Sequence, residues 1–402
     1  MKIKARLSTM MFLEFFVWGA WYATVANYMV QIGMVKHIFW AFTVGPIGAI
    51  ISPFFLGMIA DRYFSTERIL AVLHILGGIF MLIVPFFENN PVMFIVFLGL
   101  HMLCFQPTLG LCNTLSFHNI KSAEKEFPFI RMFGTVGWIV AGILVSGILI
   151  ADRTAIPLYV AGTAAIILGL YSLTLPHTPP PAKGQKSTFR EIAGIDALKK
   201  LSSPSFNLFI LCSLLICIPL SAYYAYAQTY VESAGFMRPA FNLTFGQMSE
   251  VVFILLLPWF FKRLGVKWTL FMGMAAWGVR YLLFSFGAPA ATTWMIMAGI
   301  LLHGISYDFF YVTGQIYVEE KATVDIRGQA QGFIVLVTYG VGMLIGAQVA
   351  GWIFNRVVTE TGAAALPQYG QFWLIPALFS LAVMLVFGIF FKDTVQEENK
   401  AA

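Results

Sequence analysis

Charged residues are scarce in this chain. Only 11% of its 402 residues are Asp, Glu, Lys or Arg, whereas soluble domains average about 25%. Hydrophobic residues make up 59% of the chain, and the mean hydropathy is +0.80. These values exclude an ordinary soluble domain and predict an integral membrane protein within a lipid bilayer. The formal net charge of +6 then indicates basic cytoplasmic loops, and no nucleic-acid partner is expected.

Cysteines and catalytic motifs are also few. The four cysteines lie in apolar runs without zinc or thioredoxin spacing, so we interpret them as packing residues. The sequence has no H-E-x-x-H, no G-x-S-x-G and no phosphate-binding glycine loop. No connection is long enough for a catalytic domain. We therefore expect no enzyme activity, no metal and no cofactor. The cysteines are Cys104, Cys112, Cys212 and Cys217.

Long apolar runs fill the rest of the chain. A membrane-spanning helix needs about 20 mostly apolar residues, and twelve such runs are predicted. The first contains Glu14 and has no clear cleavage site, so we interpret it as an uncleaved span rather than a signal peptide. The predicted spans are 8–30, 37–60, 69–87, 92–117, 128–150, 155–175, 205–229, 244–261, 268–287, 292–318, 328–355 and 370–391.

One polar connection divides these spans into two sets of six. It contains a Pro-Pro-Pro run at 179–181 and clustered Lys and Arg, which are typical of a linker. The predicted organisation is an N-terminal six-helix bundle (1–175), a linker (176–204) and a C-terminal six-helix bundle (205–402).

The basic residues are distributed unevenly between alternate connections. Most fall in the set that includes the linker and both termini. The positive-inside rule therefore predicts cytoplasmic termini, as an even number of spans requires. The opposite set holds only Lys36, Arg153, Arg238 and Arg356.

The two halves resemble each other weakly. GMIADRYFSTER joins the second and third spans, and PWFFKRLGVKW joins the eighth and ninth. Two related six-span halves with a cytoplasmic linker are the layout of the major facilitator superfamily. The motif formed by Gly57, Asp61 and Arg62 resembles the loop motif of that superfamily, where an acid at a helix end helps to latch one conformation. The predicted fold is therefore an all-α polytopic membrane protein of two pseudo-symmetric bundles.

Three acids fall well inside predicted spans: Glu14, Glu250 and Asp308. An ionised acid in hydrocarbon costs about 2.5–3.5 kcal/mol even on lenient insertion scales, so such residues commonly serve transport. Two basic residues, Arg131 and Arg280, lie in or near spans. The structural alternative for each of these charges is an ion pair between helices.

Helical spacing places polar residues on single faces of four spans. Lipid does not tolerate such stripes, and we expect them to face a shared cavity. Carboxylates and carboxamides suit sugar hydroxyls, and aromatic rings suit a flat base, so the set favours a neutral polar ligand with a ring. The stripes are Arg131, Thr135 and Trp138; Ser221, Tyr224 and Gln228; Gln247 and Glu250; and Gly304, Asp308 and Gln315, bordered by Tyr307 and Tyr311.

Three segments carry a family resemblance. FPFIRMFGTVGW (127–138), FGQMSEVVF (245–253) and HGISYDFFYVTGQIYVEEKA (303–322) resemble the nucleoside:proton symporter family of the major facilitators, in the branch with an SYDFYYVT-like tenth span. The resemblance implies substrate contacts at particular positions, and it implies that the acids at 250 and 308 link substrate binding to proton movement. These positions are Arg131, Thr135, Trp138, Gln247, Glu250, Tyr307 and Asp308.

The chain departs from this family at two places. Ser221 and Tyr224 stand where some members have carboxamides, and His303 stands where well-studied permeases have a tyrosine. Because the pKa of histidine is near neutral, His303 is a candidate proton relay, and its structural alternative is a hydrogen-bonded packing histidine. The sequence leaves open whether Asp308 or Glu250 carries the proton.

The function that the resemblance implies is import of uridine-like nucleosides by proton symport. Alternating access would be driven by rocking of the two halves, in a monomer in the bacterial inner membrane. The residues alone leave alternatives open. These are a facilitator for sugars or drugs, an integral-membrane enzyme and a passive structural or receptor protein.

Overall fold

The computed structural model describes residues 2–55, 64–180, 193–323 and 326–392, and within these ranges the chain is helical without strands. The predicted latch residues Gly57, Asp61 and Arg62 lie outside the described residues, as does part of the predicted linker. The chain divides into two compact units. The N-terminal unit comprises Met1–Phe189 and Arg238–Phe241, and the C-terminal unit comprises Arg190–Met237 and Asn242–Ala402.

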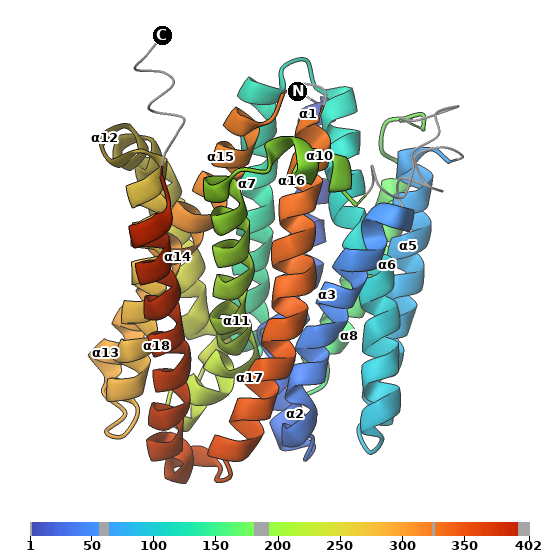
Figure 1. Cartoon of the computed structure of the whole chain (residues 1–402). Coiled ribbons are helices and arrows are strands. Elements are labelled where there is room, and N and C mark those ends of the chain that lie inside the picture. Colours follow the sequence, from blue (N-terminus) through green and yellow to red (C-terminus); the bar gives the residue numbers. More distant parts are fainter. Residues whose placement is uncertain (1, 56–63, 181–192, 324–325, 393–402) are drawn as a thin grey trace. The chain divides into compact units, whose positions relative to one another are not determined.

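The N-terminal unit is a bundle in which α1 packs against α7 and α8, α5 against α6 and α8, and α3 against α6 (Figure 1). Local sequence sets where its longest helix begins. Asn90 accepts a hydrogen bond from the Met93 amide, and Pro91 occupies the first helical position. The elements are α1 (Lys2–Tyr22), α2 (Val25–Gln31), η1 (Val35–His37), α3 (Ile38–Phe55), α5 (Thr66–Ile83), η3 (Val84–Phe87), α6 (Pro91–Asn119), α7 (Ala123–Gly142), η4 (Ile143–Ile148) and α8 (Ile156–Ser172).

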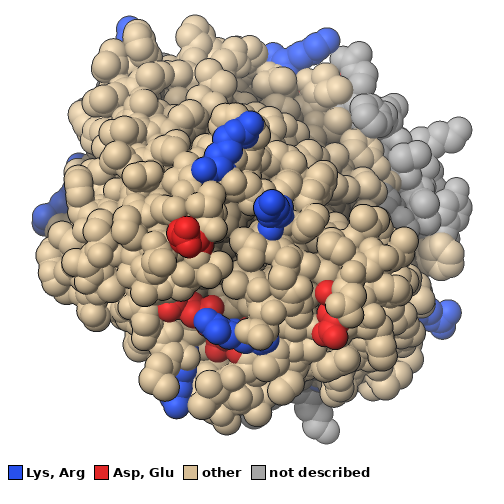
Figure 2. Space-filling view, turned by 90° about the horizontal axis from the view of Figure 1, so that it is seen from below, with Lys and Arg blue, Asp and Glu red and all other residues tan. Residues whose placement is uncertain are grey.

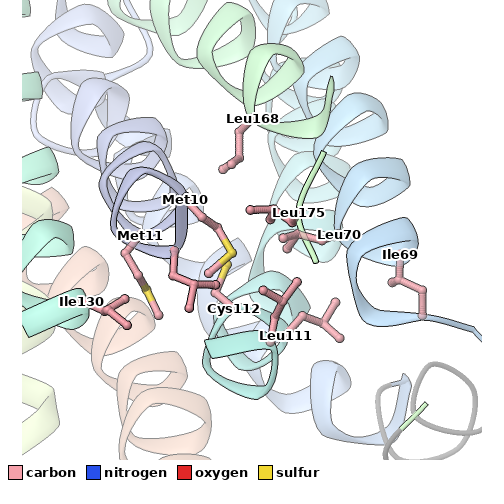
Figure 3. Packing of buried hydrophobic residues seen from close by; sticks show 11 residues of the cluster. Met10, Met11, Ile69, Leu70, Leu111, Cys112, Ile130, Leu168 and Leu175 are labelled. Carbon is pink, nitrogen blue, oxygen red and sulfur yellow. The ribbon is translucent and has the colours of Figure 1, made fainter. Parts of the chain in front are cut away.

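Apolar side chains from five helices fill part of the core of this unit (Figure 3). Met10 and Met11 of α1 lie among Leu70 of α5, Leu111 of α6 and Leu168 of α8, all of them buried. Burying a side chain of this kind contributes about 1.5–3 kcal/mol. Side chains of α1 thus share one core with those of α5, α6, α7 and α8.

The C-terminal unit is built around α11, which packs against η6, α17 and α18 (Figure 1). Ser203 caps α11 by accepting a hydrogen bond from the Phe206 amide, and Pro204 follows as its first residue. The elements are α10 (Ile195–Leu201), α11 (Pro204–Ser233), α12 (Pro239–Gly287), α13 (Thr293–Leu301), α14 (His303–Tyr307), η5 (Asp308–Val312), α15 (Thr313–Lys321), α16 (Arg327–Val335), η6 (Leu336–Gly342), α17 (Met343–Val357), η7 (Gly362–Ala365) and α18 (Leu366–Phe390).

Nine helices in the described residues are long and apolar enough to cross a membrane. One of them, α12, has 49 residues and is broken at Gly265, whose φ of 68° favours glycine. This break lies between the predicted eighth and ninth spans, and α1 and the shorter α8 lie at two further predicted spans. The count of twelve stays a prediction. Charged side chains are sparse on the face shown in Figure 2, as the composition requires.

Two membrane helices of the C-terminal unit contain π-helical turns, η5 and η6. In Figure 1, α16, η6 and α17 follow one another as one run. A π-helical turn adds about one residue to the turn and is frequent at functional sites. The predicted face of Gly304, Asp308 and Gln315 assumes an uninterrupted α-helix. That assumption is wrong beyond Asp308, because η5 changes the register before Gln315.

Candidate substrate and proton site

A chain of three polar side chains lies inside the C-terminal unit. Oε1 of Glu250 lies 2.8 Å from Nε2 of His303, and Nδ1 of the same imidazole lies 2.9 Å from a guanidinium nitrogen of Arg280. Glu250 and Arg280 both belong to α12, and His303 begins α14. The two helices approach closely because Gly304 has no side chain. A Cβ at this position would lie 2.6 Å from the Ser249 carbonyl oxygen.

This geometry assigns the tautomer of His303. A guanidinium has donors and no acceptor. Nδ1 of His303 must therefore accept the hydrogen bond from Arg280, and the ring proton resides on Nε2, where it is donated to Glu250. The imidazole is neutral in this arrangement. The predicted role of His303 as a proton relay would require Arg280 to leave Nδ1.

Aromatic rings enclose the Arg280 side chain, which is fully buried. Its guanidinium carbon lies 3.4 Å from the ring centroid of Tyr223 and 5.9 Å from that of Phe284. The Tyr223 ring in turn stacks on His303, with centroids 5.5 Å apart. A desolvated cation over an aromatic face gains about 2 kcal/mol. The rings thus hold the arginine and the histidine in one orientation.

Asp308 lies one helical turn beyond Gly304 and begins η5. It is buried, with 3% of its surface exposed. Within the described part of the chain, no donor reaches its Oδ2, and the charge with which it interacts is that of Glu250. Glu250 is more accessible, since its side chain is 20% exposed. The two acids therefore differ in both access and partners.

Three tyrosines lie near Asp308 in the chain or in the fold: Tyr307 ends α14 directly before it, Tyr311 belongs to η5 and Tyr339 belongs to η6. The hydroxyls of Tyr307 and Tyr339 form a hydrogen bond. The Tyr311 ring contacts both, tilted against Tyr307 at a centroid distance of 4.9 Å and stacked on Tyr339 at 5.2 Å. Tyr311 also contacts Cys217 of α11 through its hydroxyl, at 3.1 Å. A narrow pocket borders these rings. Its lining includes Ser213, Gln315, Thr338 and Tyr339.

The predicted residues of α11 have different surroundings. The Ser221 hydroxyl donates to the Met343 carbonyl of α17 at 3.1 Å, so it lies within a helix contact. Gln228 donates to the Tyr224 carbonyl at 3.2 Å. Tyr224 is half-buried and interacts electrostatically with Tyr311 and Tyr339. Gln247, on α12, is also half-buried, one turn before Glu250.

The three predicted residues of α7 belong to the N-terminal unit. Arg131 lies over the Phe15 ring, with its guanidinium carbon 4.2 Å from the centroid. Trp138 meets Trp18 edge to face at 5.4 Å and Tyr22 at 6.0 Å. Arg131, Thr135 and Trp138 are all half-buried and succeed one another along one face of the helix. The structure groups them with aromatic residues of α1.

Three members of the C-terminal cluster were not predicted as site residues: Tyr223, Arg280 and Tyr339. The sequence did show Arg280 as a charge inside a span, and this was the one available signal. Tyr223 and Tyr339 gave none, because a tyrosine in an apolar run is equally typical of a membrane interface or a core. Their positions follow from helix packing and from the π-helical turns.

Comparison with known proteins gives a consistent result. The family described as nucleoside H+ symporters matches residues 1–396. YegT of Escherichia coli, whose assignment to nucleoside transport is itself provisional, is 36% identical, with 99% of this chain and 96% of that protein covered. Xanthosine permease of Escherichia coli is 30% identical, with 98% and 96% covered. The crystal structure of nucleoside transporter NupG matches with a TM-score of 0.87 at 28% identity, covering 98% of this chain and 100% of that one.

The family match, the apolar helices and the likeness to the NupG structure identify a membrane transporter with a major facilitator fold, not an enzyme. The chain belongs to the nucleoside H+ symporter family. The all-α membrane fold of the major facilitator type and the proton-coupled import of nucleosides, both expected from the sequence, are thereby confirmed.

Proposed function

We propose that this chain imports uridine-like nucleosides with protons, using Asp308 as the proton-carrying acid and Glu250 as the acid that binds the nucleoside. It acts as a monomer in the bacterial inner membrane, crosses it many times and keeps both termini cytoplasmic. Its moving parts are the halves 1–175 and 205–402, joined by the linker 176–204. The observation that carries the proposal is the chain Glu250–His303–Arg280 beside Asp308.

Charge balance supports different roles for the two acids, proton carriage by Asp308 and nucleoside binding by Glu250. One buried cation, Arg280, stands near two acids, Glu250 and Asp308. Through neutral His303, the arginine compensates an ionised Glu250. A second buried negative charge would be uncompensated and costly, so Asp308 holds a proton in this state. The protonated acid is neutral while the site is closed to water, and it can donate a hydrogen bond.

Exposure and chemistry support the role of Glu250 in binding. A carboxylate accepts hydrogen bonds from two neighbouring hydroxyls, as a ribose presents them. Gln247, one turn away, adds a carboxamide. Tyr224 and Tyr307 are half-buried aromatic residues able to stack on a flat base. Gln228 orients Tyr224 through its backbone, and the Ser221 hydroxyl supports α11 against α17.

The N-terminal unit contributes a second group of substrate contacts, Arg131, Thr135 and Trp138. Arg131 donates to carbonyl oxygens of a base, and Trp138 offers a ring face. His303 is a positioning residue, because its two hydrogen bonds link Arg280 to Glu250 and hold the carboxylate in place.

Transport in proteoliposomes tests the assignment of the proton to Asp308. Asp308→Asn is expected to lose about 100-fold or more of uridine accumulation under an imposed proton gradient, the range typical of a lost acid–base group. Uridine binding and gradient-independent exchange are expected to persist, because asparagine resembles the protonated acid. Undiminished accumulation would refute the assignment. A competition panel of nucleosides against hexoses tests the substrate class, and inhibition by hexoses alone would refute it.

A further inference from the structure

A second buried acid–histidine pair lies in the N-terminal unit, far along the sequence from the proposed substrate acids. Nε2 of His74 (α5) lies 2.7 Å from Oε2 of Glu14 (α1). The Glu14 side chain is fully buried, and that of His74 is 1% exposed. The other contacts of the carboxylate come from α6: Thr108 Oγ1 lies 2.6 Å from Oε1, and Cys112 Sγ lies 3.4 Å from Oε2. Figure 3 shows Cys112 beside Met10 and Met11 in this core.

We propose that the Glu14–His74 pair is a second proton-binding site, whose occupancy sets the pH dependence of nucleoside exchange. This second site is distinct from the transported-proton site proposed at Asp308. Its proton regulates exchange and is not itself carried with the nucleoside.

The first argument is charge. Among the described residues, Glu14 contacts no Lys or Arg. A fully buried carboxylate without a cation is strongly destabilised. The pair avoids this cost only by holding a proton, either on the carboxyl of Glu14 or on the imidazole of His74. In both arrangements the pair is neutral, and without the proton it carries a bare negative charge.

The second argument is the count of hydrogen-bond donors. The single hydroxyl proton of Thr108 has two acceptors in reach, Oε1 of Glu14 at 2.6 Å and the Phe105 carbonyl at 2.5 Å. When Glu14 is ionised, Thr108 donates to it. When Glu14 is protonated at Oε1, the acid donates to Thr108, and Thr108 donates to Phe105. The network is satisfied in both states, so moving a proton onto or off Glu14 needs no change in the helices.

The third argument is a chain of rings between this pair and the proposed substrate contacts of the unit. Trp138 meets Trp18 at 5.4 Å, Trp18 meets Phe105 at 5.7 Å, and Phe105 meets His74 at 6.2 Å. Trp18 is one helical turn from Glu14, so both face the same side of α1. A shift of Trp138 on nucleoside binding would therefore move the rings that pack between Trp138 and His74.

The helices around the pair carry other titratable or charged groups. On α6, Nδ1 of His101 donates a hydrogen bond to the Gly77 carbonyl at 2.9 Å, and His101 interacts electrostatically with both members of the pair. Cys112 is the other α6 group. On α7, Arg131 lies over Phe15, the residue after Glu14. On α8, the Tyr171 hydroxyl donates to the Arg6 carbonyl.

Exchange of labelled uridine by the full chain in proteoliposomes tests the proposal. It is measured in the Asp308→Asn background, where the transported proton no longer contributes. The exchange rate of this variant is expected to change severalfold between about pH 5 and pH 8. Adding Glu14→Gln is expected to reduce that change to less than about twofold, because a carboxamide does not gain or lose a proton as a carboxyl group does. His74→Gln is expected to do the same, and it serves if the Glu14 variant fails to fold.

The matched control is His101→Gln in the same background. It removes a buried histidine of the same helix bundle but leaves the Glu14–His74 contact, and it is expected to keep the full pH dependence. An unchanged pH profile in folded Glu14→Gln or His74→Gln protein would overturn the proposal. Loss of the pH dependence in the His101 control would also overturn it, because the profile would then report general damage to the unit.

Discussion

The two units each contain a glutamate bonded to Nε2 of a buried histidine, at 2.7 Å in the N-terminal unit and 2.8 Å in the C-terminal unit. The two glutamate–histidine contacts are alike, but the charged residues around them differ. His303 receives a hydrogen bond from Arg280, whereas no arginine or lysine contacts Glu14 among the described residues. The arginine decides the charge state. It fixes a neutral histidine beside an ionised glutamate, whereas the pair without it must hold a proton of its own.

Accessibility separates the two pairs further. Glu250 is 20% exposed and Glu14 is fully enclosed. An ionised, reachable carboxylate suits a ligand with hydroxyl groups, and an enclosed, protonated pair suits a role without direct substrate contact. Similar local chemistry can therefore serve two tasks, because burial and one neighbouring cation set the protonation state.

Removing the arginine is expected to have the largest effect on this comparison. Arg280→Met makes the C-terminal pair resemble the N-terminal one and removes the charge of Arg280 from the neighbourhood of Glu250. We expect a loss of about 3–5 kcal/mol in the free energy of unfolding, as for other broken buried charge pairs. Thermal denaturation of the purified protein measures it. The double variant Arg280→Met/Glu250→Gln should regain part of the loss, and equal stability of the single and double variants would contradict the charge balance.

Neutralising the accessible acid is expected to affect binding rather than stability. Glu250→Gln should weaken uridine binding by about 1–3 kcal/mol, the cost of an unpaired or weakened buried hydrogen bond. Titration calorimetry of the purified protein measures the dissociation constant. Glu14→Gln is the control from the other pair, and its affinity should stay within about twofold of the unchanged chain. Equal losses in both variants would remove the functional distinction between the two acids.

Replacing His303 by glutamine, the change already described for His74, tests how the two histidines differ. A glutamine in place of His303 can accept from Arg280 and donate to Glu250, so it preserves both hydrogen bonds. We expect His303→Gln to keep proton-driven accumulation and to lower uridine affinity by less than about tenfold, roughly 1.4 kcal/mol. Uptake under a proton gradient measures both quantities. Complete loss of coupling with normal binding would instead make His303 the proton relay.

A modest loss of stability is expected when the hydroxyl beside the N-terminal pair is removed. Thr108→Val preserves shape but removes the group that lies 2.6 Å from Glu14. We expect a loss of about 1–2 kcal/mol, because a buried acceptor is left without its partner. Thermal denaturation measures this loss, with Thr108→Ser as the control that retains the hydroxyl. A valine variant as stable as the serine variant would show that Glu14 does not depend on this contact.

Much of the architecture could be predicted because the bilayer imposes it. Hydrocarbon requires long apolar helices with internally satisfied backbones, so composition and run length alone indicate a helical membrane protein. The acids at 14, 250 and 308 were also visible, because a charge in an apolar run is conspicuous. The faces of the helices were less predictable. Regular spacing placed Gln315 on the face of Asp308, and the π-helical turn η5 changes that register.

The sequence by itself determined the membrane class, the positions of most spans and the three acids inside predicted spans, because each of these follows from local hydropathy. The tertiary structure alone decided which groups meet. It placed Arg280 against His303 and His74 against Glu14, residues that are 23 and 60 positions apart. Protonation depends on the charges and donors within a few ångströms, and those neighbours are fixed by helix packing rather than by position along the chain.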